Sequence, residues 1–77
     1  MNWEQVQGKW KQYSGKVKEK WGRLTEDDLQ QIAGRREQLV GRIQERYGIA
    51  KEAAEEQIDE FARVLEADAK HASTHGN

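Results

Sequence analysis

The sequence predicts an all-α fold of four short helices packed as two α-hairpins, a small orthogonal helical bundle. Three observations lead to this prediction. None of the 77 residues is proline, so nothing in the composition forbids long helices. The apolar residues recur at steps of three and four, which is the period of an amphipathic helix. Finally, two segments of the chain repeat one another.

The first helix is predicted over residues 3–24. At about 100° per residue its apolar side chains fall within a stripe about 80° wide, the pattern of one amphipathic helix. The stripe consists of Trp3, Val6, Trp10, Tyr13, Val17, Trp21 and Leu24.

A second, shorter helix is predicted to begin after Thr25. Threonine is a favoured N-cap residue, and the three acids of residues 26–28 follow it, where the helix dipole favours negative charge. Leu29 and Ile32 give this helix its apolar side. Gly34 is expected to end it, because glycine adopts the left-handed conformation without a Cβ clash.

Two further helices complete the prediction. The third runs to Tyr47 with Gly48 as its terminator, and the fourth, rich in alanine and acid, continues until the apolar period is lost after Ala67. We therefore expect one helical domain over residues 1–67 and a frayed or disordered polar tail over residues 68–77.

An internal repeat relates residues 8–22 to residues 34–48 at an offset of 26. The two segments read G-K-W-K-Q-Y-S-G-K-V-K-E-K-W-G and G-R-R-E-Q-L-V-G-R-I-Q-E-R-Y-G. Their glycines coincide, and most basic, aliphatic and aromatic positions match in kind. Two related helices, each closed by glycine and followed by another helix, indicate two α-hairpins that bury their apolar stripes against each other.

The repeated glycines lie about 100° to 180° away from the apolar stripe on a helical wheel, so we expect them to face outward. A glycine inside an exposed helix costs about 0.5 to 1 kcal/mol relative to alanine. Gly8, Gly15 and Gly41 are the clearest interior cases. Three interpretations stay open: tolerated remnants of the duplication, a deliberately marginal fold that gains order when water is scarce or a partner is present, or a smooth face for close approach.

Composition argues against several functional classes. The chain has no cysteine, no signal-peptide pattern and no stretch near the roughly 18 apolar residues of a membrane span, so we expect a soluble cytoplasmic protein. His71 and His75 stand four apart, but they lie in the predicted tail without a third ligand. We expect no catalytic residue, no metal, no cofactor and no small-molecule substrate.

Charge is distributed unevenly: residues 1–23 carry +4 and the remainder −5. Lys9, Lys16, Lys20 and Arg23 fall within about 60° of one another on a helical wheel and form a basic ridge beside the aromatic stripe. This basic ridge is a candidate anion-binding site. Against it, the whole chain is slightly acidic, whereas nucleic-acid-binding domains are usually strongly basic. The simpler alternative is that the two oppositely charged parts attract each other as the helices pack.

Two runs of the sequence are distinctive, W-G-R-L-T-E-D-D at residues 21–28 and G-R-I-Q-E-R-Y-G at residues 41–48. Together with the following A-K-E-A-A-E-E-Q-I-D, they resemble the CsbD-like family of small bacterial general stress-response proteins (UPF0337 type), over about residues 2–65. The resemblance implies two packed α-hairpins, a cytosolic protein that accumulates under stress, and no enzyme. It carries over no catalytic residue and no molecular role.

The leading interpretation is therefore a non-enzymatic bacterial stress-response protein, with protection under osmotic or desiccation stress as its most concrete form. The alternative is an interaction module that binds nucleic acid or an acidic partner through the basic ridge. We expect a monomer.

Overall fold

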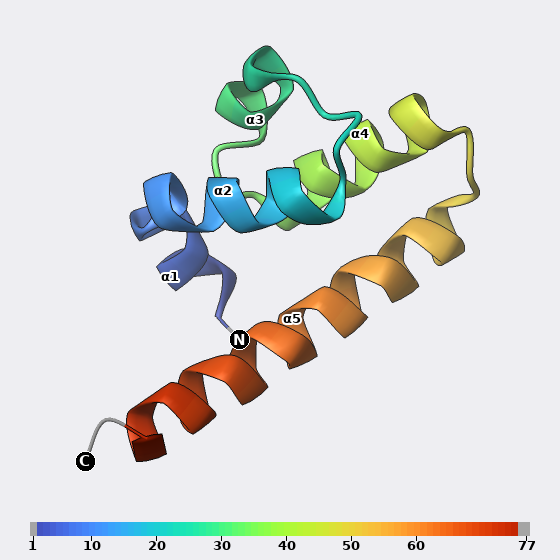
Figure 1. Ribbon diagram of the computed structural model, residues 1–77. Helices are drawn as coiled ribbons and strands as arrows, with labels where there is room; N and C mark the ends of the chain where they lie inside the picture. Colours follow the sequence, from blue (N-terminus) through green and yellow to red (C-terminus); the bar gives the residue numbers. More distant parts are fainter. Residues whose placement is uncertain (1, 76–77) are drawn as a thin grey trace.

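The structure is a computed structural model that describes the backbone of residues 2–75 and the side chains of residues 2–67. It contains the helices α1 (Trp3–Gly8), α2 (Trp10–Lys20), α3 (Glu26–Ile32), α4 (Arg36–Tyr47) and α5 (Lys51–His75) (Figure 1). No strand occurs in residues 2–75, so the predicted all-α class is confirmed.

The predicted helix over residues 3–24 is broken at Lys9, which separates α1 from α2 (Figure 1). Lys9 has φ −118° and ψ 28°, outside the α-helical range, although its N–H still closes the last turn of α1. Gly8 is thus the last residue of α1 and not a helix-interior glycine, and its low helix propensity favours a break here. The described chain therefore has five helices where four were expected.

Helix α3 begins as predicted, with Thr25 as its N-cap. The Thr25 hydroxyl accepts the Asp28 N–H at 3.0 Å, and the Asp28 carboxylate accepts the Thr25 N–H at 2.9 Å. These two bonds form a capping box, which satisfies backbone donors at the start of the helix. The left-handed residue that caps the other end is Ala33, with φ 49°, and not Gly34 as predicted.

Gly34 follows with φ 82° and is required for a second reason, the close approach of α1. A Cβ built on Gly34 would lie 2.6 Å from Cα of Gln7, closer than real Cβ atoms approach backbone. A side chain at this position would push α1 away from the junction between α3 and α4.

Gly48 caps α4 with φ 63°, as predicted. Helix α5 continues to His75, beyond the predicted end near Ala67, and in Figure 1 its C-terminal part extends past the other helices. The division of the chain at residue 67 and the frayed state expected of the tail stay predictions.

The core is a seam to which both repeats contribute, as predicted. Val17 and Ile43, which match each other in the repeat, are both fully buried. Trp21 packs edge-on against Phe61, with ring centroids 5.0 Å apart, and Trp10 is partly buried against the same cluster. The cluster comprises Val17, Trp21, Leu24, Leu29, Ile32, Leu39, Val40, Ile43, Ala54, Ile58 and Phe61.

The outward orientation predicted for the helix-interior glycines is confirmed. Gly15 in α2 and Gly41 in α4 are exposed, and a Cβ added to either would meet no atom within 4 Å. Packing therefore gives no reason for glycine at these two positions.

Candidate functional site

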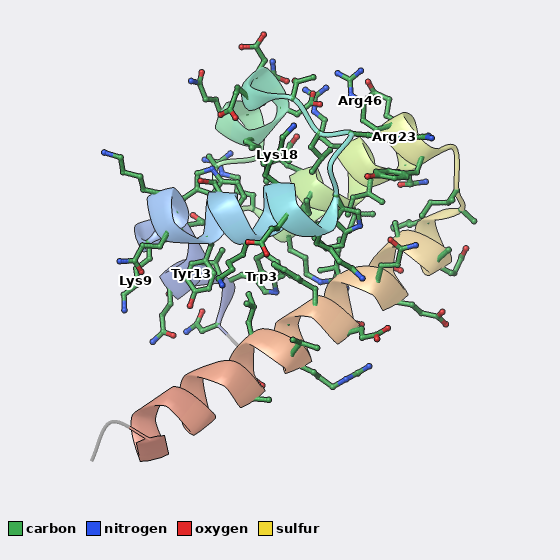
Figure 2. All side chains as sticks on the ribbon, viewed as in Figure 1. Trp3, Lys9, Tyr13, Lys18, Arg23 and Arg46 are labelled. Atoms are coloured by element: carbon green, nitrogen blue, oxygen red, sulfur yellow. The ribbon has the colours of Figure 1, made fainter. Side chains whose placement is uncertain are left out.

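The fold divides the basic ridge that the helical wheel predicts. The wheel assumes one continuous helix, whereas Lys9 lies in the turn before α2 and Arg23 in the loop after it. Figure 2 shows these two residues at opposite ends of α2. Of the four ridge residues, Lys16 and Lys20 stay together, one helical turn apart on α2.

Arg23 joins the loop after α2 to the end of α4. Its guanidinium carbon lies 5.2 Å from the centre of the Tyr47 ring, a cation–π geometry, and its backbone N–H donates to the Tyr47 hydroxyl at 3.2 Å. Arg23 is therefore engaged within the fold.

Lys16 and Lys20 line an open hollow of about 270 Å³ between α2 and α5. The remaining lining residues are Glu19, Phe61, Val64 and Leu65. Val64 is 52 % exposed, and it is the large apolar side chain that the described part of the chain leaves open to solvent. The hollow therefore combines two cations and one acid with an apolar wall, so its lining carries only a small net positive charge.

Lys18, on the other flank of α2, is also engaged within the fold. Its ammonium group donates to the carbonyl oxygen of Gly22 at 3.1 Å and to that of Leu24. A cation is favourable here because the helix dipole places negative partial charge at the C-terminal end of α2.

A buried ion cluster, which is not among the predicted sites, joins α3 to α4. The side chain of Asp28 is 2 % exposed. Arg46 donates two hydrogen bonds to the Asp28 carboxylate, from Nε to Oδ2 at 2.8 Å and from Nη2 to Oδ1 at 2.9 Å. Arg42 adds a second cation, with Nη1 3.5 Å from Oδ1. The paired geometry is the strong, bidentate form of a guanidinium–carboxylate contact.

The hydrogen bonds from Arg46 hold the pKa of the Asp28 carboxyl well below its usual range, and the backbone N–H of Thr25 acts in the same direction. Burial raises this pKa, but by less than the hydrogen bonds lower it. The same contact raises the pKa of Arg46. Asp28 is therefore a fixed negative charge near neutral pH, which suits structure and excludes it as a general acid there.

Part of this ion cluster could have been predicted from the sequence. The acids after Thr25 are expected from the sequence to stabilise the start of the helix, and Asp28 does so through the capping box. Arg42 and Arg46 stand four apart and so share one face of a helix, a signal for a carboxylate partner. Which acid they bind depends on the packing of α3 on α4.

The indole N–H groups of Trp10 and Trp21 donate hydrogen bonds to other parts of the chain. Trp10 Nε1 donates to the Leu29 carbonyl at 2.9 Å, and Trp21 Nε1 donates to Gln57 Oε1 at 2.9 Å. Buried tryptophans usually satisfy their N–H in this way, and these two rings serve the core.

The profile of the CsbD-like family matches residues 4–56, which hold both repeats and the Asp28 cluster. The chain belongs to the CsbD-like family. It is also similar to a UPF0337 protein of Rhodopirellula baltica, with 57% identity over 61 residues that cover 79% of this chain and 90% of that protein.

Membership of the CsbD-like family implies a general stress-response protein, and the family is not known as enzymatic. Among the described residues of this CsbD-like chain, no three His, Cys, Asp or Glu side chains are placed to hold a metal ion. His71 and His75 lie outside the residues whose side chains are described. Among the residues that the structure describes, no helix has the length and apolar character needed to cross a bilayer.

Proposed function

We propose that this chain is a non-enzymatic cytoplasmic protein that protects other proteins during osmotic or desiccation stress, and that its own helices gain order as water becomes scarce. Membership of the CsbD-like family supports the stress role. The proposed protection during water loss rests on features of the chain that limit its own stability.

The observation that carries the proposal is the pair of glycines in α2 and α4. Gly15 and Gly41 lie inside helices that supply the core, yet open space surrounds each missing Cβ. Each costs about 0.5 to 1 kcal/mol of helix stability relative to alanine. A core of this size rarely supplies more than about 3 to 5 kcal/mol, so the two glycines remove a large fraction of the stability that is available. A marginal fold responds strongly to solvent, because osmolytes and dehydration favour buried surface.

The surface is consistent with a protein that accumulates without aggregating. Charged residues make up 35% of the chain, and Val64 is the large apolar side chain exposed in residues 2–67. Such a surface stays hydrated and lacks the extended apolar patch that drives non-specific association.

The test is a drying assay on a desiccation-sensitive enzyme. We expect the protein to preserve enzyme activity at mass ratios at which albumin does not, and circular dichroism to show a gain in helicity on adding osmolyte or on drying. The Gly15→Ala/Gly41→Ala double variant should already be ordered in dilute buffer and gain less helix. Protection equal to that of albumin, or helicity that does not respond to water content, contradicts the proposal.

Binding of nucleic acid through the basic ridge is a separate hypothesis, and the separation of Lys9 from Arg23 does not favour it. A gel shift at increasing salt concentration tests it. Affinity should fall steeply with ionic strength if phosphates are neutralised, and the absence of a complex at low salt removes this function.

A further inference from the structure

Helix α2 begins without the sequence signals of a helix start. Its N-cap, Lys9, makes no side-chain cap hydrogen bond, and its first turn contains no acid. Instead, Lys11 places a second cation at the end of the helix where the dipole favours anions. Helix α1, by contrast, has Asn2 as its N-cap, whose side chain accepts the Glu4 N–H at 2.9 Å, and Glu4 supplies the acid. The local sequence thus starts one helix, at Asn2.

The apolar stripe also passes through the break at Lys9 without a change of phase. Val6, Trp10 and Tyr13 stand at steps of four and three, as they would on one helix. Two independent helices would not require this common register. The local sequence therefore specifies one helix over residues 3–20, and the break must come from packing.

Tertiary contacts hold α1 in its bent position. The backbone of Gln7 lies against Gly34, where a Cβ would come within 2.6 Å of Cα of Gln7. Trp10 Nε1 donates to the Leu29 carbonyl at 2.9 Å. Val6, on α1, is only 2 % exposed. In Figure 1, α1 accordingly folds back beneath α2 instead of continuing its line.

The bend replaces hydrogen bonds that a continuous helix would make. Gln12 N–H donates to the Lys9 carbonyl at 2.9 Å, whereas in one helix it would donate to the carbonyl of Gly8. Lys9 N–H donates to the Val6 carbonyl at 3.2 Å, which Trp10 N–H would use in one helix. With no side-chain cap, the first N–H groups of α2 rely on water.

Loss of water therefore acts on the bent form in two ways. Backbone N–H groups that lose their water without gaining another acceptor raise its free energy. The burial of Val6, which favours the bent form, depends on the hydrophobic effect and weakens as water is removed. Both changes favour closing the break.

We propose that α1 is a strap that is released when water becomes scarce: the break closes, α1 and α2 fuse into one helix over residues 3–20, and Gln7 leaves Gly34. The inference rests on the proposed function for its trigger, the loss of water, and it names the segment in which helix is gained. Release withdraws the buried Val6 and the partly buried Trp3 from the bundle and presents them to the surroundings.

The test measures the distance between two spin labels in the full chain by double electron–electron resonance. The chain has no cysteine, so Gln5→Cys/Lys20→Cys places one label on α1 and one at the end of α2, both at exposed positions. In one continuous helix these residues lie about 22 Å apart along the axis, and any bend at Lys9 shortens this separation. We expect the shorter distance in dilute buffer and the longer one in a dried film, with labelled protein diluted into unlabelled protein.

Lys11→Pro, added to the labelled chain, is the variant that blocks release. Proline is tolerated in the first turn of a helix, where residue 11 lies in the bent form, but in the fused helix its ring would clash with the carbonyl of Gln7. Lys11→Ala is the matched control, because it removes the same charge without the block. We expect the longer distance on drying in Lys11→Ala and its loss in Lys11→Pro. Circular dichroism in dilute buffer checks that both variants keep their helices.

Two glycine variants favour release. Gly34→Ala places a Cβ where Gln7 lies, so the longer distance should appear already in dilute buffer. Gly8→Ala is the milder variant, because its Cβ meets open space and it only raises helix propensity at the junction. It should increase the fraction of labels at the longer distance on drying, and it tests the strap even if Gly34→Ala does not fold.

Two outcomes would overturn the strap. One is a distance distribution that is the same in buffer and in the dried film. The other is a longer distance that appears equally in Lys11→Pro and Lys11→Ala. Either result leaves the proposed function standing if the protein still preserves enzyme activity on drying. Labels that separate on drying while no enzyme is protected would instead support the strap and contradict the protective role.

Discussion

The two repeats, residues 8–22 and 34–48, bury equivalent side chains but end their helices in different ways. Val17 and Ile43 are both in the core. Helix α4 ends on Gly48 in the left-handed conformation, whereas α2 ends at Trp21 with φ −120° and uses the ammonium group of Lys18 to satisfy later carbonyls. The repeat thus determines which side chains are buried, and the segment that follows each copy determines how its helix ends.

The charges of the two repeats differ in the same way. Arg42 and Arg46 bind an acid that belongs to α3, while Lys16 and Lys20 match them in sequence but face a hollow. Equivalent residues therefore acquire different roles from neighbours that the repeat does not include. Substitutions at matched positions can test this interpretation.

The largest contrast is expected between Gly34 and its repeat equivalent Gly8. Gly34→Ala should destabilise the fold by about 2 to 4 kcal/mol, because alanine is strained at positive φ and its Cβ would meet the backbone of Gln7. Gly8→Ala meets open space and should be neutral or slightly stabilising. Urea unfolding followed by circular dichroism measures both, and equal effects would show that the close approach of Gln7 does not matter.

Asp28→Ala makes α3 resemble α5 at the matched position and should cost about 2 to 3 kcal/mol, since it removes both the capping box and the bidentate contact with Arg46. Asp27→Ala is the control, because Asp27 is exposed and lies in the same helical turn. If the two variants unfold at the same urea concentration, the ion cluster contributes nothing.

The pH dependence of stability tests the same ion cluster, and its expected effect is only a part of the loss expected for Asp28→Ala. Because the pKa of Asp28 is lower in the folded state, its contribution is present above the unfolded value of about 4 and is lost as the pH falls below it. Wild-type stability should therefore decrease more steeply below pH 4 than that of Asp28→Asn. Parallel stability curves for the two proteins would contradict the fixed charge.

The smallest effects are expected where the repeats are most alike. Gly15→Ala and Gly41→Ala should each stabilise the protein by about 0.5 to 1 kcal/mol, which is a rise of several degrees in Tm for a chain of this length. The two effects should be equal and additive because the glycines lie in different helices. A decrease in Tm for one of them alone would indicate a contact specific to that helix.

The sequence was sufficient to predict the features that depend on local periodicity and capping. The core positions Val17 and Ile43, the N-cap Thr25 and the terminator Gly48 follow from residue type and spacing, and the structure confirms them. The outward Gly15 and Gly41 follow from the same wheel.

Features that depend on tertiary approach were missed. The break at Lys9 accompanies the contact of Gln7 with Gly34, and two residues so far apart in sequence give no local signal. Ala33 adopts the left-handed conformation although glycine stands next to it, and Asp28 pairs with Arg46 only because α3 packs on α4.

The short connections between helices and the absence of proline have a consequence for the rate of refolding. Three residues join α3 to α4 and three join α4 to α5, so those helices meet partners that are near in sequence, and such topologies fold within milliseconds or faster. A chain without proline also has no slow cis–trans isomerisation step. On dilution from urea the protein should therefore refold in a single fast phase.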